Sequence, residues 1–316
     1  MRFRIFGLLS AVAMLSACSG VPNGSQSDAS GGESSDGGGK LKAALLEGKP
    51  FAIKKGDGFE GWSVDVINAV KDEAGLGSVD FSVASSVDEG FEAITSGAAD
   101  IACGVAFTWE RAEKVNYSLP YAIGGTRLLA GPDVDGTPES LQGKSIGVVK
   151  DSASAKVLSD VVPDIELTNF ATPTEALDAL AEEKVDINGG PSLWLASNRG
   201  DSGKTLVPVR PYGSSGVGCI VKQDNGKLLS AASLAIGQMM QAYVDGDAGS
   251  REMINRWVGP GSAIDLSEAT ISALYRVMLA STAEISTNVQ DPAELAAVEE
   301  TVSEAETTDA ADSESN

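Results

Sequence analysis

From about residue 40 onward, short apolar runs alternate along the chain with stretches whose apolar residues recur at helical spacing. Residues 62–74 place Val66 and Val70 on one face, and residues 79–83 alternate apolar and polar side chains. The first spacing predicts an amphipathic helix and the second a half-buried strand. The resulting order of strand, helix, strand, helix and strand is typical of a mostly parallel sheet covered by helices. We therefore expect an α/β fold.

A second series of the same kind begins after Gly131-Pro132. Its second helix opens at Thr172-Pro173-Thr174-Glu175, which is a capping box with proline in the first turn. Two α/β units of similar size, the second inserted in the first, predict a cleft between them, and such interfaces are common small-molecule sites. The later elements that we expect are strands at 145–149, 165–170, 205–209 and 217–221 and helices at 152–162, 228–244, 251–258 and about 266–285.

The amino terminus has the pattern of an export signal. Arg2 and Arg4 precede an apolar stretch at 5–15, which is too short to span a bilayer comfortably. The stretch ends in Leu15-Ser16-Ala17-Cys18, which resembles the bacterial lipobox, in which the cysteine is lipidated after cleavage. The alternative is a plain secretory signal that is cut after a small residue, with Cys18 incidental. In either case we expect the protein in the periplasm, anchored to a membrane only through Cys18 if it is lipidated.

Two segments flank the α/β region and contain little that could be buried. Residues 19–39 are mostly Gly, Ser and Asp, a composition typical of a flexible tether. Residues 290–316 contain no Lys or Arg and are rich in Asp, Glu, Ala, Ser and Thr, which predicts a solvated, disordered acidic tail.

The composition excludes several functions. The formal charge of −22 disfavours nucleic acid and anionic lipid as partners, because phosphate groups repel an acidic surface. The chain contains no histidine, which rules out Ser-His-Asp and Cys-His catalysis and histidine-ligated zinc. We therefore expect no metal, no cofactor and no enzymatic activity. Cys103 and Cys219 remain as two thiols in an exported chain, and the sequence leaves open whether they pair or stay single and buried.

One arginine stands out in the segment AFTWERAEKVNYSLPY, residues 106–121. Arg111 follows Thr108 by three positions, at the start of a short run of helix formers. Arginine presents a rigid fork of donors that matches a carboxylate with two hydrogen bonds. Arg111 is therefore a candidate carboxylate clamp. The alternative is an exposed arginine that pairs with Glu110 or Glu113 on its own helix.

Several segments, taken in order, resemble family 3 of the periplasmic solute-binding proteins, the polar amino-acid receptors of ABC importers. The resemblance covers roughly residues 42–260, and it is the ordered set that makes it specific. The matching segments are Pro50-Phe51, 61–66, 97–101, the Thr108, Glu110 and Arg111 group with 115–121, 141–148, 175–177 and Val185-Asp186. Residues 257–262 and the helix after them resemble a cyanobacterial branch of the family described as transporter orphans.

The resemblance implies a type II periplasmic-binding-protein fold: two lobes, each with a mostly parallel sheet flanked by helices, joined by a hinge of two crossover strands that lets the lobes close on a ligand. The domains that we expect are a signal peptide at 1–17, a lipid-anchor tether at 18–39, lobe 1 at 40–129 and 214–285, lobe 2 at 130–213 and a disordered tail at 286–316.

The resemblance also implies a set of ligand-binding residues. Arg111, with Thr108 before it, takes the position that holds the ligand carboxylate, and Ser152 opens a lobe 2 helix whose N-terminus suits an anion. Phe51 is the stacking wall, and Gly104 lies where the ligand meets the first-lobe backbone. Two alternatives stay open: Ser152 as a plain helix cap and Phe51 as a core residue. Trp62 is expected in packing.

The sequence departs from the family at the site for the ligand's ammonium group. The family places an aspartate about five residues after the Asp186 position, and residues 187–192 contain no acid. Asp186 itself is expected to be structural, and Asn188 and Ser192 offer uncharged acceptors. Ala106 also lacks a hydroxyl that the family often has. Glu47 could supply the missing charge from lobe 1, because a buried ammonium without a partner is costly.

Three functions are therefore weighed. The first is capture of a small carboxylate-bearing solute, an amino acid by preference, for an ABC permease. The second keeps the fold as a sensor or interaction module without an importer. The third is an enzyme of the periplasmic dehydratase type, whose general acid or base would come from a carboxylate such as Glu47 or Asp151.

Overall fold

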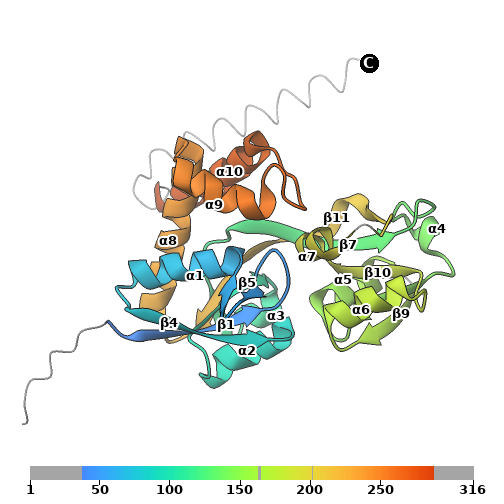
Figure 1. Cartoon of the computed structure of the whole chain (residues 1–316), viewed down its shortest axis with the longest axis horizontal. Coiled ribbons are helices and arrows are strands. Elements are labelled where there is room, and N and C mark those ends of the chain that lie inside the picture. The colour runs from blue at the N-terminus through green and yellow to red at the C-terminus, as the bar shows by residue number, and fades with distance from the viewer. Residues whose placement is uncertain (1–37, 163–164, 201, 288–316) are drawn as a thin grey trace, which may run out of the picture. The chain divides into compact units, whose positions relative to one another are not determined.

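The computed structural model describes residues 38–162, 165–200 and 202–287, with side chains up to residue 281 (Figure 1). The signal peptide predicted from the sequence lies outside these ranges. So do Cys18 and nearly all of the predicted tether and acidic tail. Their predictions are therefore untested.

The first lobe is built on a parallel sheet. Strand β1 pairs in parallel with both β4 and β5, and its last four residues are all buried. A strand covered on both faces reads as a continuous apolar run, and Ala43 to Leu46 form such a run. The elements of this part are β1 (Lys40–Leu46), β2 (Ile53–Lys55), β3 (Gly58–Glu60), α1 (Trp62–Glu73), β4 (Ser78–Ala84), α2 (Val87–Ser96), β5 (Ile101–Ala106), α3 (Trp109–Ala112) and β6 (Val115–Tyr117).

The second lobe repeats the pattern on a smaller scale. Strand β8 pairs in parallel with β9 and with β10. The expected cap of α6 is present, because the Thr172 side chain accepts a hydrogen bond from the backbone N–H of Glu175. The elements are α4 (Pro138–Leu141), β8 (Ser145–Val149), α5 (Ala153–Val161), β9 (Glu166–Phe170), α6 (Pro173–Ala181), β10 (Ile187–Pro191) and α7 (Ser192–Asn198).

Two long strands, β7 (Ala122–Ala130) and β11 (Thr205–Lys222), cross between the lobes. They pair antiparallel with each other, β7 continues to β10, and β11 continues to β5. The two parallel sheets are thereby joined into one nine-stranded sheet in the order β4-β1-β5-β11-β7-β10-β8-β9, with β6 on β11. The sequence predicted two strands at 205–209 and 217–221. They are the two ends of β11, which shifts register twice between Val207 and Ser215 while staying paired with β7.

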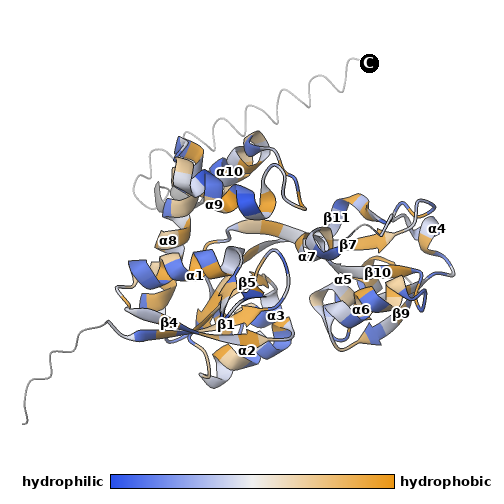
Figure 2. Cartoon of the chain, viewed as in Figure 1, coloured by the Kyte–Doolittle hydropathy of each residue, from blue (hydrophilic) through white to orange (hydrophobic). Residues whose placement is uncertain are grey.

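The chain ends its described part with three helices that pack on the first lobe, α8 (Gly226–Asp245), α9 (Ala248–Val258) and α10 (Glu268–Thr287). Helix α8 lies against α1, and α10 lies against α8 (Figure 1). Hydrophobic and hydrophilic residues are mixed along each helix (Figure 2), as expected for helices that bury one face against neighbouring elements. Trp62 packs in this core as expected, with its ring centroid 5.0 Å from that of Tyr121.

A disulfide connects Cys103 of β5 with Cys219 of β11. The two residues are direct partners in the antiparallel ladder, and both are fully buried. This answers the question that the sequence left open. The bond fastens one end of the crossover strand β11 to the centre of the first-lobe sheet.

Candidate functional site

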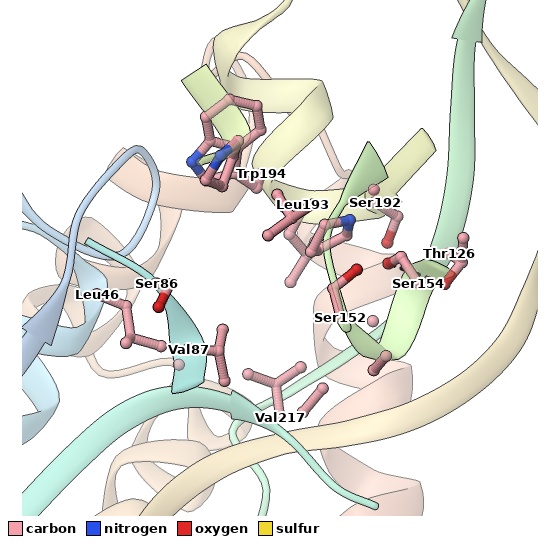
Figure 3. A pocket seen from close by; sticks show the side chains of 18 of the residues that line it. Leu46, Ser86, Val87, Thr126, Ser152, Ser154, Ser192, Leu193, Trp194 and Val217 are labelled. Carbon is pink, nitrogen blue, oxygen red and sulfur yellow. Dashed lines mark hydrogen bonds between the residues drawn. The ribbon is translucent and has the colours of Figure 1, made fainter. Parts of the chain in front are cut away.

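A cavity of about 200 Å³ is lined by both lobes and by the crossover strands (Figure 3). Its first-lobe wall comes from the ends of β1 and β5 and the start of α2, and its second-lobe wall from the start of α5 and the β10–α7 turn. Ligands of parallel α/β sheets bind at such strand ends. All six ligand-binding candidates from the sequence line this cavity: Glu47, Phe51, Gly104, Thr108, Arg111 and Ser152. Their roles in binding stay predictions.

Arg111 is the cation among the residues that line the cavity. Its side chain is only 13% exposed, and its Nη1 donates to the carbonyl oxygen of Ala106 at 3.3 Å. Its ion pair is with Asp88, at 3.5 Å from Nη2. The surface-charge alternative named Glu110 or Glu113 as the partner, and the structure gives Arg111 a different one, from α2. Arg111 also forms a side-chain hydrogen bond with Tyr117. A guanidinium has five N–H donors, so these contacts still leave donors for a ligand.

Tyr117 shares a hydrogen-bond acceptor with Arg111. Its hydroxyl donates to the same Ala106 carbonyl oxygen at 3.1 Å. Burial raises the pKa of Tyr117, while the positive charge of Arg111 acts in the opposite direction. The phenol therefore stays neutral at physiological pH, and it fixes the carbonyl that orients the guanidinium.

Three of the hydroxyl groups that line the cavity serve as helix caps. Thr108 caps α3 by accepting from the N–H of Arg111, and Ser152 caps α5 by accepting from the N–H of Ala155. Ser86 caps α2 in the same way. A hydroxyl oxygen that accepts from the backbone still has its own proton to donate. The cap role of Ser152 and its predicted ligand role are therefore compatible.

Gly104 allows Phe51 to lie flat against β5. The backbone of Gly104 has φ of +91°, and a Cβ there would be 3.0 Å from a ring carbon of Phe51. The Phe51 ring is 7% exposed, belongs to the first-lobe core and also lines the cavity. Phe51 is therefore a core residue that also lines the cavity, and its stacking role against a ligand stays a prediction.

The carboxylates at the cavity come from lobe 1 alone. Glu47 and Asp88 line it, and none of its described second-lobe residues is acidic. Asp186 is structural as expected: its carboxylate accepts from the backbone N–H of Ser145, which lowers the pKa of Asp186. Asn188 is buried outside the cavity, whereas Ser192 lines it and accepts from the N–H of Gly125.

Three contacts join the lobes beside the cavity. Lys156 of α5 forms an ion pair with Glu110 of α3, and this contact lowers the pKa of Glu110. The Asn198 side chain donates to the carbonyl oxygen of Lys49 at 2.8 Å. Trp194 packs against Gly48, where an added Cβ would be 2.1 Å from Nε1 of the indole. The lobes therefore touch each other on both a charged and an apolar patch.

Sequence reasoning missed several residues of the site. Asp88, Val87, Leu193 and Trp194 all line the cavity. The sequence Ser86-Val87-Asp88-Glu89 has the spacing of a capping box, which would have placed Asp88 in the first turn of a helix. No local pattern indicates that this turn lies beside Arg111, 23 residues further along the chain.

Two further observations concern membranes and metals. Among residues 38–287 that the structure describes, no helix combines the length and apolar character needed to cross a bilayer. In the same part of the chain, His, Cys, Asp and Glu side chains do not gather in any group of three or more that could hold a metal ion.

The fold and the cleft define a two-lobed binding protein of the type II periplasmic class, and the comparisons with known proteins agree. Residues 42–306 match the family of bacterial extracellular solute-binding proteins, family 3. The chain belongs to this family. The fold class predicted from the sequence is thereby confirmed.

Individual relatives match over shorter stretches. The probable amino-acid-binding protein YxeM of Bacillus subtilis (strain 168) is 30% identical over 141 residues, 43% of this chain and 53% of that protein. The virulence sensor protein BvgS of Bordetella bronchiseptica is 27% identical over 152 residues, 46% of this chain and 12% of BvgS. The chain thus matches about half of the first relative and about an eighth of the second.

A solved structure covers more of the chain. The crystal structure of the ancestral amino acid-binding protein AncCDT-1, a precursor of cyclohexadienyl dehydratase, superposes with a TM-score of 0.60 at 21% identity. The match covers 69% of this chain and 95% of that one. At this identity the likeness concerns the fold.

Proposed function

We propose that this protein captures a small carboxylate-bearing solute of the amino-acid class and delivers it to an ABC permease. Arg111 is the observation that carries the proposal. It is a nearly buried guanidinium with donors left for a ligand, and it lies in a cavity shared by two lobes. A planar fork of this kind suits a carboxylate, and a site with little water strengthens the attraction.

Capture would proceed by closure of lobe 2 onto a ligand bound first on lobe 1. A ligand drives closure only if it binds the closed form more tightly than the open form. The Ser152 hydroxyl and the start of α5 are the second-lobe groups suited to supply that difference, because a helix N-terminus attracts an anion. The protein would do no chemistry, and the lobes would have the predicted boundaries of 40–129 with 214–285 and 130–213.

The location that fits this role is the periplasm. Export through the signal at 1–17, lipidation of Cys18 and a tether over 18–39 would hold the binding domain near a membrane permease. These steps rest on the sequence motif, since the residues lie outside the described ranges.

The match to the sensor protein BvgS supports a second candidate, a sensor or interaction module without an importer. Stimulation of ATP hydrolysis by a reconstituted permease complex would favour the transport role. Its absence, together with ligand-dependent binding of a membrane partner that is not a permease, would favour the sensor role.

A thermal-shift screen of the full chain tests the capture proposal. The screen contains the twenty amino acids and small carboxylates, with Arg111→Ala and the matched surface variant Lys114→Ala. We expect at least one compound to raise the melting temperature of the wild type and of Lys114→Ala, and Arg111→Ala to lose that shift. A shift that survives in Arg111→Ala would contradict the clamp role.

A further inference from the structure

We propose that the cleft takes a zwitterionic amino acid with an aliphatic side chain, and that Asp88 accepts its ammonium group. This inference rests on the proposed function and deepens it. The family's second-lobe aspartate is missing here, and the structure offers a replacement on lobe 1. Asp88 and Arg111 line the same cavity, with their charged atoms 3.5 Å apart.

The spacing of this pair suits a zwitterion. An α-amino acid carries its ammonium and its carboxylate on one carbon, so its two charges are neighbours. Placed head to tail against the pair, the ammonium faces Asp88 and the carboxylate faces Arg111. The existing ion pair is at the outer limit of hydrogen-bonding distance, and the guanidinium has more donors than its present contacts use. The ligand can therefore bind without displacing Asp88.

The hydroxyl groups add donors on the carboxylate side. Ser86, Thr108 and Ser152 each use their oxygen as an acceptor for a helix N-terminus, so each has a proton to donate into the cavity. Thr108 and Arg111 belong to the same turn. The cavity lining therefore offers hydroxyl donors in addition to Arg111, and Asp88 is an acceptor in the same lining.

Most of the remaining wall surface is apolar. Leu46 and Val87 from lobe 1 face the cavity together with Leu193 and Trp194 from α7, and Val157 of α5 also lines it (Figure 3). Among the described residues, lobe 2 contributes no charged side chain to the lining. A charged ligand side chain that reached lobe 2 would lose its hydration without gaining a partner from that lobe, and the other carboxylate of the lining, Glu47, comes from lobe 1. An aliphatic ligand side chain has no charged group to desolvate, and it buries apolar surface.

Three ligands with the same aliphatic side chain test the proposal by calorimetry on the full chain. They are L-leucine, its counterpart without the amino group (4-methylpentanoate) and its counterpart without the carboxylate (3-methylbutylamine). We expect the wild type to bind leucine at least about tenfold more tightly than either analogue, since a charge-assisted hydrogen bond contributes that much or more.

Two isosteric variants then assign the ammonium partner. Asp88→Asn is expected to weaken leucine binding about tenfold and to abolish the preference for leucine over 4-methylpentanoate. Glu47→Gln removes the other cavity carboxylate and is expected to keep the preference for leucine over 4-methylpentanoate. Far-UV circular dichroism and melting curves check that both variants are folded.

Several results would overturn the inference and leave the proposed function standing. These are tighter leucine binding in Asp88→Asn, loss of the preference in Glu47→Gln instead, or tighter binding of L-arginine or L-glutamate than of L-leucine by the wild type. If the folded wild type showed no thermal shift with any amino acid or carboxylate in the screen, the proposed function would be overturned as well.

Discussion

At position 104 the backbone has a positive φ next to an aromatic ring, a combination that only glycine tolerates without cost. A side chain there would pay about 1–3 kcal/mol for the backbone conformation. Its Cβ would also be within 3.0 Å of the Phe51 ring and 3.1 Å of the Ser63 hydroxyl. Because Gly104 has no side chain, the Phe51 ring, which lines the cavity, can pack closely against strand β5.

We expect Gly104→Ala to lower the free energy of unfolding by more than Gly97→Ala does. Gly97 ends α2 with φ of +81° and has no neighbour within 4 Å of an added Cβ. The Gly97 variant thus measures the backbone cost alone, and the difference measures the contact with Phe51. Urea unfolding of the two variants gives both numbers. Equal losses would mean that the ring moves aside freely.

At the scale of elements, the disulfide between β5 and β11 is the strongest single constraint. Its cysteines are 116 residues apart in the sequence. A crosslink that closes a loop of this length is expected to stabilise the fold by about 4–5 kcal/mol, because it limits the unfolded chain.

We therefore predict that a reductant lowers the urea midpoint of the wild type substantially. The variant with both Cys103→Ala and Cys219→Ala should unfold near the reduced midpoint whether or not reductant is present, since no bond remains to be reduced. A wild type that keeps its midpoint when free thiols have been detected would contradict this expectation.

The elements that could be predicted from the sequence are those that depend on local signals. The cap at Thr172 and the three C-terminal helices are encoded by neighbouring residues, and the structure places them close to the predicted ranges. Strand β11 was predicted as two strands, 205–209 and 217–221, and the residues between them, which include Pro211 and Gly213, have no strand pattern of their own. Its continuity depends on β7, a partner far away in the sequence.

The residues of the candidate site also fall into those that a local motif indicates and those that depend on packing between distant segments. Arg111 and Thr108 were found because they form one short motif, and Ser152 because it follows a strand. The contact of Arg111 with Asp88 depends on the packing of α2 beside α3, which no local pattern encodes. The cavity wall formed by Leu193 and Trp194 was missed for a related reason, since α7 was not predicted at all.

At the scale of the whole molecule, the ion pair of Glu110 with Lys156 joins the lobes across the cleft. Both side chains are exposed, so the pair contributes little and is weakened by salt. Its effect should be on the balance between open and closed forms, because that balance needs only small free energies to shift.

We predict that Lys156→Glu increases the radius of gyration measured by X-ray scattering at low salt. The charge-swapped double variant, Glu110→Lys with Lys156→Glu, should restore the wild-type value. The pKa of Glu110 is lowered by Lys156, so the pair is intact above the ordinary glutamate pKa and is lost as the pH falls through the lowered pKa of Glu110. The difference between wild type and Glu110→Gln should accordingly vanish in acid. A single variant that scatters like the wild type at low salt would rule out this role.

The disulfide also decides how the molecule is connected. It closes a covalent ring from residue 103 to residue 219, and the whole of lobe 2 is inside that ring. The ring begins in β5 and ends in β11, and these two strands are paired neighbours in the first-lobe sheet. A single cut of the backbone anywhere in lobe 2 therefore opens a ring instead of dividing the protein. Both halves of lobe 1 stay joined, and a molecule damaged at its outer lobe remains one covalent piece.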